Sequence, residues 1–428
     1  MSDRKILHAA DIHLDSALQK LGSYQDAPAE KIRGASRCAL RNMTQLAIDE
    51  QVDLVVIAGD LYDGDWRDVH TGLFFVSQAK RLVQAGIPIV VIRGNHDAAN
   101  LMTSSLPLPK NPDGSEIMMA ADRVDGRIFE KIGISVHGRS FGNREEKEGM
   151  VGQYPSPHRG MFNLGLMHTS LNGSANHDRY APCSAVELTD KEYDYWALGH
   201  IHVRGQHGID GGAPIVFSGN IQGRHIRESG AKGCIIVDVD SRDQTTQRFV
   251  PLDVVRWEVC LIDASQVDSA DDIMDLYQTW LGQTLLQIED RMLVTRIRVT
   301  DATKLHTELH RNRRSIEDSL RSITIAHGDD RTWVEKLSVQ TSLASAAMAS
   351  GEMDGPMQSL HAVIDGLRGS DDAAKAIENE LSSLLKKLPV DMIGKNTDIN
   401  LDDPAWIDQV INSASADLID RLGQEVGQ

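Results

Sequence analysis

The chain has 428 residues, of which 41% are hydrophobic and 25% charged, and this composition is typical of a soluble globular protein with two or three domains. No apolar run approaches the length of a membrane span, and the N-terminal stretch lacks the apolar core of a secretory signal, so we expect a cytoplasmic protein with no membrane association. Its four cysteines form no CxxC pair, which argues against zinc-ribbon and thioredoxin-like proteins.

The formal net charge of −18 is unusual for a protein that handles nucleic acid. Residues 1–255 carry 27 basic and 32 acidic side chains, and residues 256–428 carry 17 and 30. The acidity therefore belongs mainly to the C-terminal part. That part is either a solvated helical region or a surface that meets a basic partner.

Short apolar runs alternate with helical stretches along the first part of the chain. Strands are expected at residues 5–11, 52–60 and 87–95, with helices at 29–51 and 71–86. This rhythm predicts parallel strands that are buried on both faces. Further strands are expected at residues 132–141, 162–168, 193–200, 213–219 and 232–240. Few helices separate them, which favours antiparallel pairing and a second sheet.

The pattern changes after about residue 255. A helix at 263–287, a strand at 291–300 and a helix at 304–322 predict a small α+β domain. Residues 359–388 have helical spacing without recognisable chemistry. We therefore expect three parts: residues 1–254, a capping domain at 255–345, and a helical C-terminal region at 346–428.

Polar residues that can bind metal follow five of the apolar runs at the point where each run ends. They are Asp11 and His13, Asp60, Asn95, His168, and the pair His200 and His202. Sites in open α/β folds assemble at the carboxyl ends of parallel strands, and these nitrogen and oxygen ligands suit first-row divalent metals. Seven such side chains are enough for two ions.

The spacing supports this interpretation. Residues two apart on an extended chain point to the same side, so Asp11 with His13, and His200 with His202, could each reach one ion pair. Alone, a histidine at a strand end is more often structural, and a Gly-Asp pair is usually a turn. The ordered series D-x-H, GD, GNHD, H and GHIH favours the metal site instead.

With these motifs, residues 5–235 resemble the calcineurin-like metallophosphoesterase superfamily and, within it, the SbcD-type DNA repair exonucleases. The stretch "SGNIQGRHIRESGAKG" (residues 218–233) is similar to the segment that follows the last metal histidine in that branch. The resemblance implies an α/β (α+β) fold in which two mixed β-sheets pack face to face between helices, followed by a smaller capping domain.

The resemblance also implies two divalent ions, which would be Mn²⁺. Asp11, His13 and His202 would hold the first ion; Asn95, His168 and His200 would hold the second; and Asp60 would bridge them. Such a pair can clamp a phosphodiester and activate water near neutral pH.

His96 follows Asn95 directly and would face the substrate, where we expect it to stabilise or protonate the leaving O3′. Asp97 would orient His96 by accepting its second N–H, or would cap a following helix. Asp63 stands where some family members carry a histidine, and is either a turn residue or an acceptor behind the ligands. Arg224, His225 and Arg227 would contact substrate phosphates, although surface exposure is the simpler explanation for each.

The resulting hypothesis is a Mn²⁺-dependent DNA exonuclease that cuts 3′ to 5′, in repair, with an SbcC-like SMC-type ATPase and in a homodimer. The ATPase would supply the basic surface that this chain lacks. Residues 346–428 would either form its docking site or pack against the chain's own domains. Alternatives are a phosphatase or small-molecule phosphodiesterase with the same metals, and a scaffold without catalysis. The complete ligand set argues against the scaffold.

Overall fold

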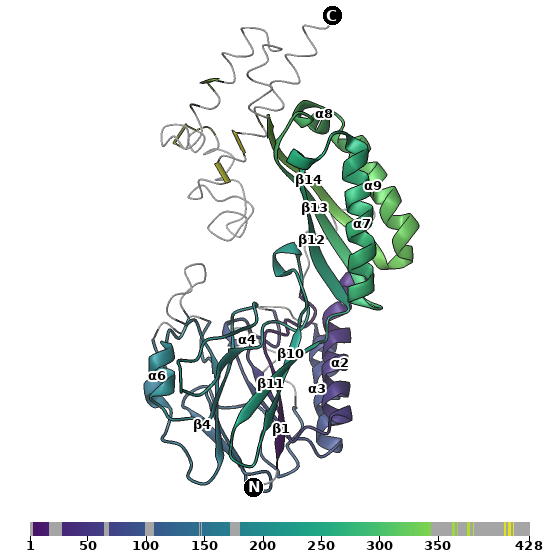
Figure 1. Cartoon of the computed structure of the whole chain (residues 1–428). Coiled ribbons are helices and arrows are strands. Elements are labelled where there is room, and N and C mark those ends of the chain that lie inside the picture. Colours follow the sequence, from purple (N-terminus) through teal and green to yellow (C-terminus); the bar gives the residue numbers. More distant parts are fainter. Residues whose placement is uncertain are drawn as a thin grey trace, which may run out of the picture. The chain divides into compact units, whose positions relative to one another are not determined.

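The structure is a computed structural model that describes residues 3–16, 28–63, 68–98, 107–144, 146, 148–171 and 180–343, with isolated positions between 362 and 414. The chain forms two compact units, one comprising Met1–Glu258 with Asp290–Leu293, the other comprising Val259–Glu289 and Val294–Gln428 (Figure 1). The sequence placed the first boundary after residue 254. The predicted helical region at 346–428 lies almost entirely outside the described residues.

Two mixed sheets form the centre of the first unit. The first sheet has the order β11-β10-β1-β2-β3 and comprises β1 (Arg4–Ala9), β2 (Leu54–Ala58), β3 (Ile89–Ile92), β10 (Gly233–Val239) and β11 (Thr245–Pro251). Its strands β1, β2 and β3 are parallel, whereas β10 is antiparallel to both β1 and β11.

The second sheet has the order β4-β5-β6-β7-β9-β8. Its strands are β4 (Asp125–Phe129), β5 (Ile134–Gly138), β6 (Phe162–His168), β7 (Tyr195–Gly199), β8 (Gly205–Gln206) and β9 (Ile215–Phe217). Strands β5, β6, β7 and β9 are parallel, and β4 and β8 are antiparallel edge strands. The predicted α/β class with two mixed sheets is confirmed.

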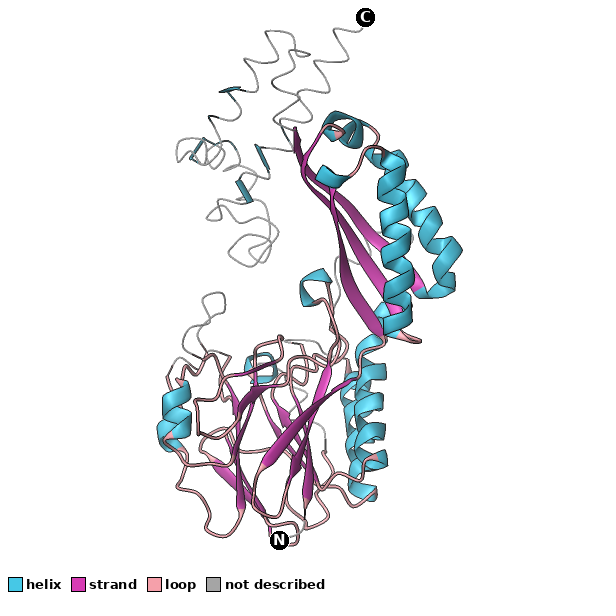
Figure 2. Ribbon diagram, in the orientation of Figure 1, coloured by secondary structure: helices cyan, strands magenta, loops and turns pink. Residues whose placement is uncertain are grey.

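The central strands of both sheets are buried on both faces, as the apolar runs of the sequence indicated. Val56 and Val90 of the first sheet pack in one core with Leu164 and Leu166 of the second. The outer face of the first sheet packs against α2 (Ala35–Asp49) and α3 (Val69–Gln84). The outer face of the second sheet is covered in part by α6 (Ala185–Thr189) (Figure 2).

Leu166 tests the importance of the layer between the sheets, because its side chain is fully buried there. We expect Leu166→Ala to destabilise the first unit by about 2–5 kcal/mol, since the removed atoms leave a cavity between two rigid sheets. Calorimetric thermal unfolding of the full chain should show that the first unit unfolds at a lower temperature. Leu73 lies on the solvent side of α3, and half of it is exposed. Leu73→Ala is therefore the matched control and should leave the unfolding temperature of the first unit nearly unchanged.

Two local predictions need correction. The helix expected over 29–51 is two helices, α1 (Ala29–Arg33) and α2, which meet at Gly34. The segment after β3 turns at once into the short helix α4 (Asn95–Ala98), so it does not stay extended through Asn95. Glycine weakens a continuous helix, and the tight turn after β3 is a tertiary feature that hydrophobic periodicity does not report.

The second unit is an α+β layer pair. Its sheet has the order β12-β13-β14, with β12 (Val255–Asp263), β13 (Met292–Thr303) and β14 (Thr332–Leu343). The helices α7 (Ala270–Ile288), α8 (His306–Arg311) and α9 (Arg313–Gly328) accompany it, with α7 and α9 on one face (Figure 2). The hydroxyl groups of Tyr277 (α7) and Thr324 (α9) form a hydrogen bond of 2.7 Å, which links the two helices.

Among the residues that the structure describes, the remaining helical segments are short 3₁₀ helices: η2 (Val151–Gln153), η3 (Ile226–Glu228), η4 (Ala264–Gln266) and η5 (Asp329–Arg331). None of the helices in the described part of the chain has the length and apolar character that a membrane span requires.

Candidate metal centre

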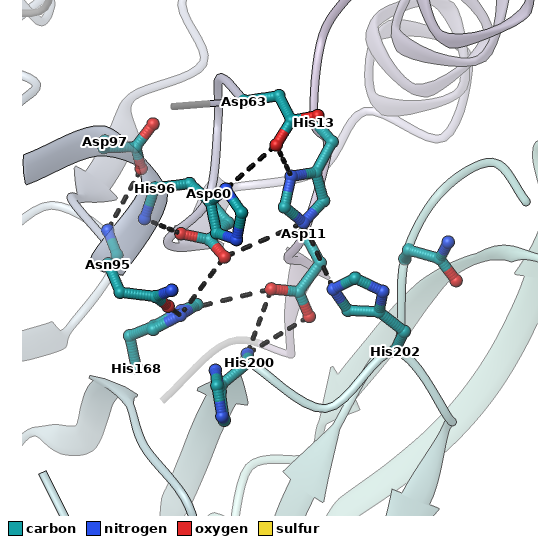
Figure 3. A network of polar contacts seen from close by, with 12 residues as sticks. Asp11, His13, Asp60, Asp63, Asn95, His96, Asp97, His168, His200 and His202 are labelled. Atoms are coloured by element: carbon teal, nitrogen blue, oxygen red, sulfur yellow. Dashed lines mark hydrogen bonds and ion pairs between the residues drawn. The ribbon is translucent and has the colours of Figure 1, made fainter. Parts of the chain in front are cut away.

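The carboxyl ends of five parallel strands from both sheets meet at one rim, and they bring the seven predicted ligands together (Figure 3). Strands β1, β2 and β3 lead into Asp11 and His13, Asp60, and Asn95 respectively, while β6 and β7 lead into His168 and the pair His200 and His202. The centre thus lies across the junction of the two sheets.

Asp11, His13 and His202 form the first group, and one ligand atom from each lies within 4.8 Å of the others. The Nε2 atoms of His13 and His202 point toward one another and are 3.1 Å apart. His202 donates from Nδ1 to Glu228 Oε1 at 2.7 Å, which leaves its Nε2 as the lone-pair nitrogen. These three side chains could therefore hold a single cation.

The second group surrounds His168. Its Nε2 is 3.0 Å from Asn95 Oδ1 and 3.5 Å from Asp60 Oδ2, and its Nδ1 donates to the Ala58 carbonyl at 2.9 Å. That donation fixes the tautomer with Nε2 available for a metal. The ring of His200 lies edge-on to His168, with centroids 5.3 Å apart, and the His200 amide donates to Asp11.

Asp60 lies between the two groups. Its Oδ2 is 3.5 Å from His168 Nε2 and 3.7 Å from His13 Nε2, so a single oxygen faces one histidine of each group. Its Oδ1 accepts the backbone N–H of His96. This geometry is what a carboxylate shared by two cations requires.

Four of the seven residues have a left-handed backbone, with φ of 51° at Asp11, 44° at His13, 51° at Asp60 and 100° at His200. Such angles are uncommon for residues other than glycine and persist where the surrounding structure enforces them. They also correct the expected geometry. Asp11 and His13 converge through these turns after β1 has ended, and not through the alternation of an extended strand.

Gly59 and Gly94 both leave space for the ring of His168, and Gly59 also has a backbone angle that favours glycine. Gly59, before Asp60, has φ of +92°, a conformation that glycine adopts freely. Gly94, before Asn95, has no positive φ, but a Cβ there would lie 2.3 Å from Asp60 Oδ1 and 2.7 Å from His168 Cε1. Gly94 therefore provides space for Asp60 and His168.

We expect Gly94→Ala to displace Asp60 and His168 and to weaken metal binding by about 10- to 100-fold, because both side chains would have to leave their positions. Isothermal titration calorimetry with Mn²⁺ measures the loss directly. Gly86→Ala is unsuitable as a control because of its positive φ, but Gly152→Ala has open space around the new methyl group and should bind as the wild type does.

Burial and the close carboxylates dominate the electrostatics of the rim. Burial alone would lower the pKa of His168, but Asp60 and Asp11 outweigh it and raise that pKa to about 9. Burial lowers the pKa of His13 to about 3 and raises the pKa of Asp11. For Asp60, the nearby His168 and His13 overcome burial and hold its pKa below the ordinary value. The two aspartates of the rim thus favour a positively charged group beside them.

His96 lies beside the first group and is less buried than the ligands. Its ring centroid is 4.9 Å from that of His13, and 32% of its side chain is exposed. Its Nδ1 is 2.9 Å from Asp63 Oδ1, and the same oxygen is 3.6 Å from His13 Nδ1. Burial would lower the pKa of His96, but Asp63 and Asp60 outweigh it and raise that pKa. His96 is thus a partly exposed imidazole whose protonated form is favoured by Asp63.

The carboxylate that holds His96 differs from the one expected. Asp97 is buried, and its carboxylate accepts backbone N–H groups of Leu61, Tyr62 and Gly94. It fastens the turn after β2 to the turn after β3. Asp63, for which the sequence left a turn or an acceptor role open, is the residue whose carboxylate contacts His96.

The three expected substrate contacts lie in different settings. Arg224 lies beside the centre with 18% of its side chain exposed, and it is held by Glu228, whose side chain is 6% exposed. His225 is half-exposed, 3.9 Å from Glu228, and Arg227 is exposed. Glu228 was not singled out from the sequence, although its position four residues after Arg224 in a conspicuous motif was a usable signal.

Comparison with known proteins agrees with this geometry. The calcineurin-like phosphoesterase family profile matches residues 4–204, and the profile of the middle domain of metallophosphoesterase YhaO matches residues 257–342. "Uncharacterized metallophosphoesterase YhaO" of Bacillus subtilis is 31% identical over 281 residues, which span 65% of this chain and 67% of that protein. The chain belongs to the calcineurin-like metallophosphoesterases.

Two further relatives of this metallophosphoesterase are named for DNA repair or nuclease action. "DNA double-strand break repair protein Mre11" of Sulfurisphaera tokodaii is 25% identical over 279 residues, covering 62% of this chain and 67% of that protein. The SbcD component of the SbcCD nuclease of Staphylococcus epidermidis is 26% identical over 278 residues, covering 59% and 70%.

Metallophosphoesterases of this family use a dinuclear divalent centre, and the residues present fit one. Imidazole nitrogens and carboxylate oxygens from five strand ends face each other at distances that an intervening cation would relieve. A third close group, His13, Asp63 and His96, shares His13 with the first. Because Asp63 and His96 are more exposed, we assign them to the substrate side of the centre.

Proposed function

We propose that this metallophosphoesterase is a Mn²⁺-dependent exonuclease that hydrolyses DNA phosphodiester bonds in the 3′ to 5′ direction. The observation that carries the proposal is the position of His96, a partly exposed histidine paired with Asp63 at the edge of a buried ligand rim. The names of two relatives, Mre11 and the SbcCD nuclease, support DNA as the substrate.

Different residues of the chain have different roles in the proposed reaction. When two divalent ions are bound, they supply Lewis-acid activation of the phosphodiester and of the attacking water. Asp60, the ligand shared by both groups, sets the spacing of the centre. His96 is placed to give its proton to the leaving O3′, and Asp63 holds the imidazole and favours its protonated form.

DNA binding requires positive charge that this chain carries only in part, since its net charge is −18. We propose that an SbcC-like SMC-type ATPase completes the DNA-binding surface and docks on residues 346–428, within the strongly acidic C-terminal part. Homodimer formation and a cytoplasmic location belong to the same proposal.

Turnover with a panel of substrates tests the proposal. The purified chain with Mn²⁺ is offered a 3′-recessed duplex labelled at its 5′ end, bis(p-nitrophenyl) phosphate, p-nitrophenyl phosphate and a cyclic nucleotide. We expect shortening of the DNA from its 3′ end, abolished by EDTA and restored by Mn²⁺. Efficient hydrolysis of the monoester or the cyclic nucleotide with intact DNA would contradict DNA as the substrate.

The acidic surplus favours one alternative, a phosphodiesterase for small molecules, which needs the same centre but no basic surface. The same panel separates the two functions. Stimulation of DNA cleavage by the ATPase partner, with no change in hydrolysis of the small diester, would favour the nuclease.

A further inference from the structure

Arg224 is a cation built into the wall of the centre. Its backbone N–H and its guanidinium both contact Glu228, with 2.7 Å from the amide to Oε2 and 3.0 Å from Nη2 to Oε1. Glu228 also accepts from His202 at 2.7 Å and from Asn220 at 3.0 Å. One buried carboxylate therefore fixes a metal-ligand histidine and the guanidinium together.

The other edge of Arg224 faces the substrate side. Nη1 makes no hydrogen bond to any residue that the structure describes, and it lies 3.8 Å from Asp63 Oδ2. The other oxygen of Asp63 contacts His96 Nδ1. Arg224 and His96 thus face different oxygens of the same Asp63 carboxylate. Since His96 is assigned to the leaving group, the guanidinium lies on the same side of the centre.

The surroundings fix the direction of this edge. Asp11, Asp60 and Asp63 line the rim with negative charge, and burial of a guanidinium is costly unless its donors are satisfied. Glu228 satisfies the Nε and Nη2 side, so the remaining donor is held in a fixed direction. A planar guanidinium oriented in this way is suited to bind a phosphate oxygen.

We propose that Arg224 binds the phosphate next to the scissile one, on the leaving side of the DNA strand, and thereby selects polynucleotides over isolated phosphodiesters. The inference rests on the proposed nuclease function and on the assignment of His96 to the leaving O3′. In a strand cut from its 3′ end, the leaving O3′ belongs to the nucleotide on the 5′ side of the scissile phosphate. That nucleotide carries the second phosphate on its own 5′ carbon.

Two dinucleotides isolate the contact. TpT contains one phosphodiester and no second phosphate, whereas pTpT adds a 5′-phosphate on the leaving side. We expect the wild type with Mn²⁺ to prefer pTpT over TpT in kcat/KM by about 10- to 100-fold, as for a charge-assisted hydrogen bond. Arg224→Ala should reduce the preference to about 1, and Arg224→Lys should retain part of it as a point charge.

The ratio of kcat/KM for pTpT to kcat/KM for TpT separates phosphate binding by Arg224 from a purely structural role. If Arg224→Ala lowers both rates and preserves the preference for pTpT, Arg224 only positions Glu228 and His202, and the proposal is wrong. It is also wrong if the wild type shows no preference. Arg123→Ala, at a surface arginine paired with Asp122, is the matched control and should keep both the rates and the ratio.

Binding provides a second readout. In a His96→Ala background that slows turnover, isothermal titration calorimetry measures the Kd of pTpT and TpT, and Arg224→Ala should remove the difference between them. Bound Mn²⁺ is measured in every variant. If the wild type hydrolyses bis(p-nitrophenyl) phosphate but no dinucleotide or duplex, the nuclease function itself fails, and this result differs from loss of the ratio alone.

Discussion

Asp60→Asn is expected to reduce phosphodiester hydrolysis by at least about 10³-fold, because one oxygen of this carboxylate faces a histidine of each ligand group. An amide keeps the size of the side chain and its contact with the His96 backbone but supplies no negative charge to share. Mass spectrometry of metal content after gel filtration should show fewer than about two Mn²⁺ per chain. Turnover of bis(p-nitrophenyl) phosphate gives the rate.

Asp122→Asn is the matched control, since that side chain is 75% exposed and pairs with Arg123 at the surface. It should keep both the metal content and the rate. Retention of two ions and normal turnover in Asp60→Asn would show that Asp60 is not the shared ligand, and the assignment of two linked metal groups would then have to be abandoned.

His96→Ala is expected to lower kcat on DNA by about 10²- to 10⁴-fold while leaving metal binding unchanged. The reason is that His96 lies beside the ligands, with its proton directed by Asp63. The loss should depend on the leaving group. Departure of the sugar O3′ needs a proton, whereas p-nitrophenolate departs without one, so bis(p-nitrophenyl) phosphate should lose much less activity than DNA.

An equal loss on both substrates would contradict proton donation by His96 and would favour a role in substrate binding. Asp63→Asn should show the same dependence on the leaving group with a smaller effect, because the imidazole remains but is no longer held by a charge. His158→Ala changes an exposed histidine outside the centre and serves as the control for both variants.

The proximity of the proposed ligands could be predicted because each lies at the end of an apolar run, where strand order and residue type can be recognised together. Parallel strands were expected from the βαβ rhythm, and sheets of this kind place such ends at a common rim. The seven expected residues lie at one rim, which the backbone reaches through left-handed turns, and His200 adjoins the others through its ring and its backbone amide.

Partners of these residues were harder to predict because they depend on tertiary packing. Asp97 is adjacent to His96 in sequence, but the helical turn of α4 directs it toward the amides after β2, and Asp63 comes to His96 from another loop. The same limit applies to Glu228, whose contacts with His202 and Asn220 follow from how the segment after β9 folds back. Such pairs have no periodicity to reveal them.

Ligands from two separate β layers converge on one rim, so any ion held there is a cross-link between the layers. Separation of the sheets would release the ion, and by mass action an increase in free metal would then favour the assembled sandwich. Free divalent metal would in this way raise the free energy of unfolding of the first unit as well as support its chemistry.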